Sequence, residues 1–252
     1  MGERDSDRFA PTVETVLAEL RSKGSAAHRE HAVRVGITAE ASFGVSTADV
    51  RRMAREIGRD QAFALKLWTT GFHEARLLAV LIADPRQLNA RGVTAWLEDI
   101  GSWDLCDHFC TALVCTRPEA EALVFRWAAD GRLYVRRAAL ATIACLAVHR
   151  DDLDPHTFAR FLETIRYLAE DERPLVRKAA SWALRELGKR DFQSHDLAVG
   201  CATDMIEDGS RGARWVAKDA LRELQTLVAV PHRRRLLTSK SKMGAKQTKD
   251  GS

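Results

Sequence analysis

Trp103 and Asp107 are the residues whose types and spacing first point to chemistry. They lie four positions apart in the segment 102–108, near the middle of the chain. If this segment is helical, the indole and the carboxylate share one face and lie one turn apart. Such a pair can hold a cation or a sugar, so we interpret it as a candidate binding or catalytic site.

The composition is that of a soluble globular protein, with 252 residues, 46% of them hydrophobic and 29% charged. No apolar run approaches the roughly 18 to 20 residues of a membrane-spanning helix, and Met1–Asp5 lacks the layout of a signal peptide. We therefore expect a cytoplasmic protein with no membrane partner.

The five cysteines indicate neither a disulfide framework nor a metal site. They are odd in number and lie inside apolar helical patterns, as small buried side chains do in a reducing compartment. Cys106, His108 and Cys110 fall within five helical positions but point in different directions, and no second cluster supplies a fourth ligand. We expect no metal and no cofactor.

The net charge of +4 is unevenly distributed along the chain. Residues 231–252 hold seven Lys or Arg against one Asp, a net charge of +6, which leaves −2 for residues 1–230. We expect a folded domain over 1–230 and a basic, disordered tail over 231–252, whose contribution to nucleic-acid binding would be salt-sensitive and sequence-independent.

Helical signals recur through the first half of the chain, whereas strand signals are nearly absent. An apolar stripe over 13–20 ends at Lys23-Gly24, and Ser46 with Asp49 forms a capping box before the next helix. Further helices are predicted over 60–68 and 74–82, the latter stopped by Asp84-Pro85. The polar residues 1–10 are expected to fray, and the fold is expected to be all-α.

Three segments of the second half align without gaps: 133–139, 174–180 and 211–217. Their offsets are 41 and 37 residues, a period typical of HEAT-like repeats, in which stacked helix pairs form a solenoid with a concave binding face. Arg136, Arg177 and Arg214 are equivalent and should be structural arginines of the repeat. Two sets of equivalent apolar residues should face the core. They are Ala138, Ala179 and Val216, and Ile143, Leu184 and Leu221.

Two further equivalent positions differ in character between the repeats. One holds Arg137, Lys178 and Trp215, and the other, four residues later, holds Ala141, Trp182 and Asp219. We interpret them as solvent-facing, and together with Trp103 and Asp107 they would form a stripe of rings, cations and a carboxylate suited to a DNA backbone.

Each of these residues also has a plain structural interpretation. Most helical tryptophans pack in the core, and Trp68, Trp96 and Trp127 are assigned there. Arg137 could form a salt bridge, Asp107 could cap a helix or pair with an arginine, and Asp104 is assigned a structural role.

Four motifs occur in a specific order along the chain: Phe43-Gly44-Val45, the segment 102–107, Arg-Arg-Ala-Ala at 136–139 and the segment 178–185. Together they resemble the AlkD-type DNA alkylation repair proteins, over roughly residues 40–225. The resemblance implies a HEAT-like fold and a monofunctional glycosylase that removes positively charged alkylpurines such as 3-methyladenine and 7-methylguanine. It assigns catalytic roles to Asp107, Trp103 and Trp182 and DNA binding to Arg137. To these we add Lys178 and Trp215 as DNA-binding residues.

The residues fit this chemistry. An alkylated cationic purine is already a good leaving group, so the need is to stabilise an oxocarbenium-like sugar. Asp107 can supply roughly 4 kcal/mol at about 4 Å, and the two indoles can add cation-π attraction. We expect the protein to act as a monomer on double-stranded DNA containing alkylated bases, and to be nucleoid-associated when bound.

Two alternatives remain open at this point. The chain could be a non-catalytic HEAT-repeat protein that recognises distorted or branched DNA, or a protein-binding scaffold, the commonest use of such arrays. A pure DNA binder releases no base, and a scaffold shows little salt-dependent binding to duplex DNA.

Overall fold

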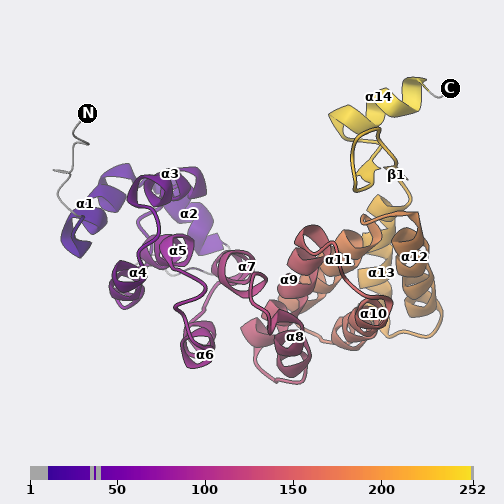
Figure 1. Cartoon of the computed structure of the whole chain (residues 1–252), viewed down its shortest axis with the longest axis horizontal. Coiled ribbons are helices and arrows are strands. Elements are labelled where there is room, and N and C mark those ends of the chain that lie inside the picture. Colours follow the sequence, from indigo (N-terminus) through magenta and orange to yellow (C-terminus); the bar gives the residue numbers. More distant parts are fainter. Residues whose placement is uncertain (1–10, 35–36, 38–40, 251–252) are drawn as a thin grey trace, which may run out of the picture. The chain divides into compact units, whose positions relative to one another are not determined.

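The computed structural model is all-α, as the periodicity predicts, and describes residues 11–34, 37 and 41–250 (Figure 1). The expected fraying of residues 1–10 lies outside this range. The chain packs as two compact units, unit 1 (Met1–Leu113) and unit 2 (Val114–Ser252), where the sequence predicts one repeat domain over 1–230. No helix among the described residues is long and apolar enough to cross a membrane.

Unit 1 consists of short helices joined by capped turns. They are α1 (Val13–Lys23), α2 (Ala26–Arg34), α3 (Thr47–Ile57), α4 (Gln61–Trp68), α5 (His73–Ile82), α6 (Ala90–Glu98) and α7 (Trp103–Phe109), which continues into a π-helical turn, η2 (Cys110–Val114). The predicted signals are confirmed: Gly24 caps α1, and Ser46 Oγ accepts a hydrogen bond from the Asp49 amide and donates one to its carboxylate.

A buried carboxylate holds the Phe-Gly-Val turn of unit 1. Glu74 on α5 is only 2% exposed. Its carboxylate accepts hydrogen bonds from Ser42 Oγ (2.7 Å) and from the amides of Phe43 (3.0 Å), Gly44 (2.8 Å) and Val45 (3.2 Å). Gly44 has φ +76° and a Cβ there would lie 2.5 Å from the Ser25 carbonyl oxygen, so only glycine fits.

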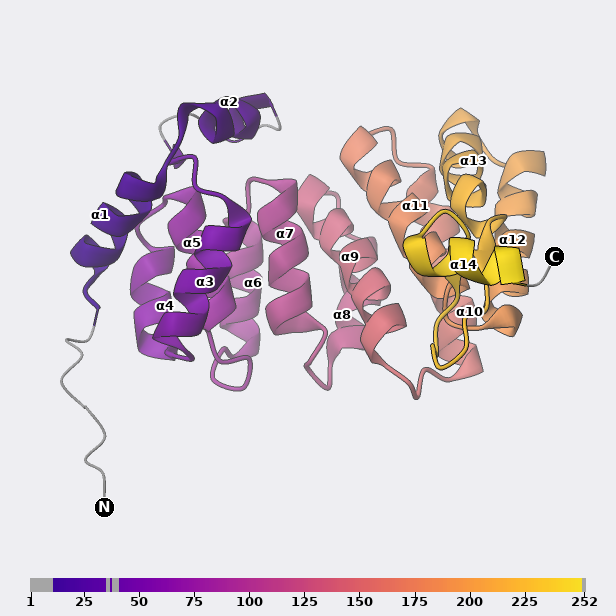
Figure 2. The same cartoon turned by 90° about the horizontal axis from the view of Figure 1, so that it is seen from above.

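Unit 2 contains the predicted repeats. Its elements are α8 (Ala120–Ala128), α9 (Leu133–His149), α10 (Pro155–Ala169), α11 (Pro174–Gly188), α12 (Phe192–Glu207), α13 (Arg211–Leu224), β1 (Leu227–Val228), β2 (Leu237–Thr238) and α14 (Lys242–Asp250). The three aligned segments are the starts of α9, α11 and α13, and α11 packs against both of the others (Figure 2). The repeat register read from the sequence is therefore confirmed.

The equivalent arginines are structural, as predicted. Each donates to a backbone carbonyl in or near the turn before its own helix: Arg136 to Asp130, Arg177 to Glu172 and Arg214 to Ile206. Because those carbonyls lie in the last turn of the preceding helix or just after it, the arginine joins the start of one helix to the end of another.

The equivalent apolar positions form the core of unit 2. Ala138, Ala179 and Val216 are buried, as are Ile143 and Leu184, whereas Leu221 is half-buried.

The tryptophans assigned to the core lie there. Trp68 and Trp96 of unit 1 stack with ring centroids 4.1 Å apart and are each 4% exposed. Trp127 of unit 2 is 5% exposed.

The cysteines are all buried, and two of them are paired. Cys115 and Cys145 form a disulfide, with Cα atoms 6.2 Å apart, contrary to the expectation that the cysteines stay reduced as small buried side chains. Burial raises the pKa of the Cys201 thiol to about 11, so this side chain behaves as a small apolar group.

The C-terminal segment differs from the disordered tail expected over 231–252. Its described part, up to residue 250, forms the antiparallel ladder of β1 with β2 and the helix α14. The order has a physical cause, since Leu236 is buried at 4% exposure and its amide donates to the Lys189 carbonyl (2.9 Å). Composition alone does not show such anchoring.

We predict that Glu74→Gln destabilises the protein by about 3 kcal/mol, because buried amides lose a charged acceptor and face a new N–H group. Urea unfolding measures the change. The matched control is Glu56→Gln on the exposed face of α3. Equal midpoints for the two variants would contradict the role of Glu74.

A second prediction concerns Asp171, whose side chain is 3% exposed and contacts Arg136 and Arg173. The hydrogen bond from Arg173, followed by that from Arg136, holds the pKa of Asp171 well below its usual 3.8, although burial opposes the shift. Because the folded-state pKa is lowered, this stabilisation is complete above about pH 5 and is lost as the pH falls through the folded pKa.

Asp171→Asn should therefore lower the free energy of unfolding by about 2 kcal/mol at pH 7, and the difference from the wild type should shrink below about pH 4. Thermal unfolding between pH 7 and pH 2 measures it. The control is Asp196→Asn, since that side chain is 83% exposed. A difference that does not change with pH would contradict the assignment.

Candidate nucleic-acid interface

Trp103 and Asp107 lie on one face of α7, one turn apart, as the spacing predicts. The opposite face of α7 is buried through Leu105, Cys106 and Phe109, and α7 packs against α5. Both Trp103 and Asp107 are consequently half-buried. A half-buried carboxylate can still contact a ligand, and the effective dielectric around it is lower than that of water.

Asp104 is structural, as predicted, because it joins α7 to α5. Its Oδ2 lies 2.9 Å from His73 Nε2. Burial raises the pKa of Asp104, but hydrogen bonding and the charge of His73 outweigh this and leave the pKa below its usual value. His108 extends the network, with Nδ1 2.8 Å from the Asp104 carbonyl and Nε2 3.1 Å from Arg51 Nη2.

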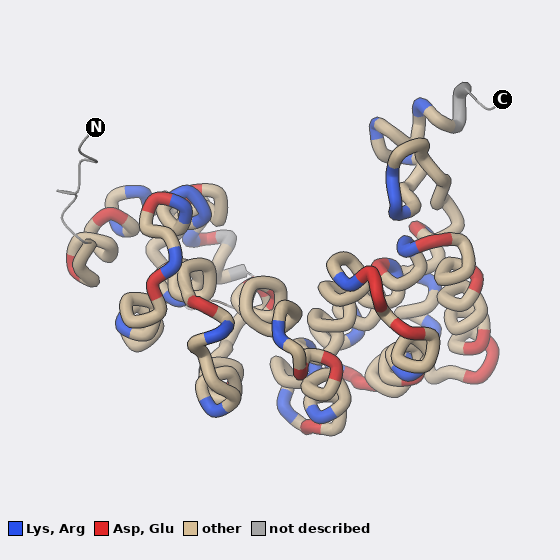
Figure 3. Tube along the Cα trace, viewed as in Figure 1, with Lys and Arg blue, Asp and Glu red and all other residues tan. Residues whose placement is uncertain are grey.

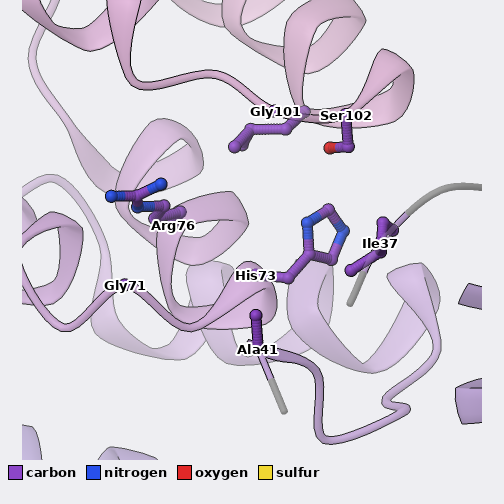
Figure 4. A pocket seen from close by; sticks show the side chains of 8 residues that line it. Ile37, Ala41, Gly71, His73, Arg76, Gly101 and Ser102 are labelled. Atoms are coloured by element: carbon purple, nitrogen blue, oxygen red, sulfur yellow. The ribbon is translucent and has the colours of Figure 1, made fainter. Parts of the chain in front are cut away.

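A small polar pocket lies at the starts of α5 and α7, with His73, Arg76 and Ser102 among its lining residues (Figure 4). Its volume is about 170 Å³. Within the described part of the chain, Ser102 Oγ is buried without a hydrogen-bond partner. This pocket therefore adjoins α7, with the Ser102 side chain among its lining residues.

In unit 2, the position shared by Arg137, Lys178 and Trp215 recurs one turn into α9, α11 and α13. Lys178 is exposed and Trp215 is 40% exposed, as predicted. Arg137 is only 5% exposed, contrary to the expectation that this position faces solvent. The reason is that α9 is largely buried along its length, between α8 and α11.

Lys178 and Trp215 line one pocket, together with Pro174, Arg177 and Arg211. Its volume is about 510 Å³, and we call it the Lys178–Trp215 pocket. Three cationic side chains beside an indole are suited to a phosphate and a stacked sugar or base. Arg211 does not stand out as a DNA-binding residue in the sequence, and the repeat alignment indicates only a structural role for Arg177, although both lie in the aligned segments.

Arg137 contacts the start of α11, the helix that carries Lys178. Its Nη1 donates to the carbonyl of Leu175, 2.8 Å away, in the first turn of α11. That turn leads directly to Lys178, so the buried guanidinium fixes the backbone that carries an exposed cation.

The second shared position also departs from a uniform solvent-facing stripe. Trp182 is half-buried and Ala141 is fully buried. Asp219 accepts hydrogen bonds from Ser181 Oγ (2.6 Å) and Arg185 Nη1 (3.1 Å), so its carboxylate joins α13 to α11. The same aligned position therefore serves packing in one repeat and polar contacts in another.

Across the described residues, no group of three or more His, Cys, Asp or Glu side chains is arranged to hold a metal ion.

The fold and these residues define a helical-repeat protein with a cationic, aromatic surface, and the sequence as a whole places it in a family. The profile of the DNA alkylation repair enzymes matches residues 16–224, so the chain belongs to this family. The comparison with curated proteins finds no match.

A solved structure shows the same fold. It is described as a new family of proteins related to the HEAT-like repeat DNA glycosylases with affinity for branched DNA structures. The TM-score is 0.70 at 20% sequence identity, with 96% of this chain and 95% of that chain covered. The HEAT-like repeat fold is confirmed by this likeness.

We predict that Lys178→Gln makes the slope of log K against log salt for duplex binding shallower by about one, because one phosphate contact is lost. Trp215→Leu should weaken binding by about 1 to 3 kcal/mol through lost stacking. Fluorescence anisotropy with a labelled duplex between 50 and 200 mM salt measures both.

Lys218→Gln is the matched control, because Lys218 is an exposed lysine of α13 that does not line the pocket. If all three variants bind like the wild type, the Lys178–Trp215 pocket is not a DNA contact.

Proposed function

We propose that this protein is a DNA repair glycosylase that excises positively charged alkylated purines, such as 3-methyladenine and 7-methylguanine, from duplex DNA. The observation that carries the proposal is the Trp103 and Asp107 pair, half-buried on one face of α7 in a chain of the DNA alkylation repair family. The reaction is hydrolysis of the N-glycosidic bond.

In this proposal Asp107 stabilises the positive charge that develops on the deoxyribose as the cationic base departs. The attraction between a carboxylate and a cation at about 4 Å is roughly 4 kcal/mol at an effective dielectric near 20. If it is gained mainly in the transition state, it corresponds to a rate enhancement on the order of a thousandfold. Trp103, on the same face of α7 as Asp107, adds cation-π attraction for this charge, and Trp182 of unit 2 is a proposed catalytic residue on the family resemblance alone.

The remaining residues bind DNA. Lys178, with Arg177 and Arg211 beside it, contacts phosphates, and Trp215 stacks on a sugar or base. The family resemblance assigns DNA binding to Arg137. Its burial and its hydrogen bond to Leu175 support a positioning role for the start of α11 instead.

A second candidate is a non-catalytic binder of branched DNA. It is favoured by the structural neighbour, which is described as having affinity for branched DNA structures. This candidate uses the same cations and rings but gives Asp107 no chemical role.

Asp107→Asn separates the two candidates. A glycosylase should lose release of 3-methyladenine and 7-methylguanine from methylated duplex DNA on the order of a thousandfold, while its affinity for the duplex is retained, because the side chain keeps its shape. Chromatography of the released bases measures the loss. Glu56→Gln, at an exposed site of α3, should leave release unchanged. Absence of release by the wild-type protein, with tight binding to a four-way junction, would establish the second candidate.

A further inference from the structure

The segment from β1 to α14, residues 227–250, carries charge of one sign only among its described side chains. We call it the C-terminal module. Its charged residues are Arg233, Arg234, Arg235, Lys240, Lys242 and Lys246, and Figure 3 shows no acidic residue between β1 and the described part of α14. The rest of the chain, by contrast, mixes both signs.

One of these cations anchors the module to the repeats. The Arg235 side chain is 20% exposed, and its Nη2 donates to Glu186 Oε2 (2.6 Å) and to the Glu186 carbonyl (2.9 Å) on α11. Its Nη1 donates to the Ala147 carbonyl on α9 (2.5 Å). A single arginine thus ties the module to two repeat helices.

Backbone packing completes the anchor. The Leu236 amide bonds to the end of α11 through Lys189, and β1 pairs with β2. Helix α14 packs back on this ladder, and a Cβ on Gly244 would lie 2.3 Å from the Thr238 carbonyl oxygen. The module is therefore a defined structure whose backbone holds the attachment points of the charged side chains in place.

The anchor leaves most of the charge facing solvent. Arg234 pairs with Asp151, whereas Arg233, Lys240, Lys242 and Lys246 are exposed. Lys242 and Lys246 are one helical turn apart on α14, so their ammonium groups share a face.

Nearby carboxylates of α13 do not cancel this charge, because they already have cationic partners on the repeats. Lys240 shares a pocket with Asp219 and Glu223. Asp219 is bound by Arg185 and Arg222, and Glu223 by Arg185 and Lys189.

We propose that the C-terminal module is a second DNA-contact surface, which binds backbone phosphates distinct from those held by the Lys178–Trp215 pocket. The proposal rests on the DNA binding of the proposed function but not on base excision. Flexible lysines presented on a fixed scaffold suit a regular polyanion, since each neutralised phosphate releases condensed counterions without reading sequence.

The test is the fourfold variant Arg233→Gln, Lys240→Gln, Lys242→Gln, Lys246→Gln, measured by anisotropy on an undamaged duplex of about 30 base pairs. Removing three or four phosphate contacts should reduce the slope of log K against log salt by about 3, and should weaken binding at least about tenfold at 100 mM salt. Base excision plays no part in this readout, so the result is independent of whether the protein is a glycosylase.

Two further variants test whether charge is the cause and whether the two sites bind different phosphates. Lys240→Arg with Lys242→Arg and Lys246→Arg keeps the charge and should keep the wild-type slope. Adding Lys178→Gln to the fourfold variant should lower the slope by the sum of the two losses, because the phosphates are different.

An unchanged slope in the fourfold variant, with an unchanged melting temperature, would overturn the proposal. So would a combined variant that loses no more than the fourfold one, since the two sites would then share phosphates. Binding of the wild type to vesicles containing anionic lipid, lost in the fourfold variant while duplex binding is kept, would assign the surface to a membrane instead.

Discussion

The structure of unit 2 depends on an arginine that recurs at one position of each repeat and binds a backbone carbonyl near the turn before its own helix. Helix ends leave carbonyl groups without partners, and a guanidinium has enough donors to satisfy them and still contact a carboxylate. Arg136 does both, through the carbonyl of Asp130 and the carboxylate of Asp171. The first turns of α9, α11 and α13 are fixed in this way, and the candidate DNA-binding residues lie on those turns.

The residue that follows this arginine shows how one position acquires different uses in a repeat protein. In α9 it is Arg137, buried and bonded to the start of α11, while in α11 and α13 it is Lys178 and Trp215, which line a common pocket. Burial by neighbouring helices, which differs along an array, decides between these uses. Helix α9 is buried along most of its length, so Arg137 supports the surface from within, whereas Lys178 and Trp215 on α11 and α13 form the surface.

Much of the fold follows from the sequence, because local signals and repetition are both visible in it. The Gly24 stop, the Ser46 cap and the starts of α9, α11 and α13 agree with the structure, as do the buried Trp68, Trp96 and Trp127. What escapes prediction depends on contacts between distant segments. The burial of Arg137, the pairing of Asp219 with α11 and the anchoring of Arg235 by Glu186 all require knowledge of which helices meet. The Trp103 and Asp107 pair is one turn apart as predicted, and its chemical role is a proposal.

The burial of Leu236 against the end of α11 has a consequence for the integrity of the array itself. Helix ends leave carbonyl groups without intrahelical partners. Arg235 and Leu236 donate to the carbonyls of Ala147, Glu186 and Lys189, at or near the ends of α9 and α11. A chain shortened to Val230 would keep every repeat helix, yet lose these donors at the ends of two of them.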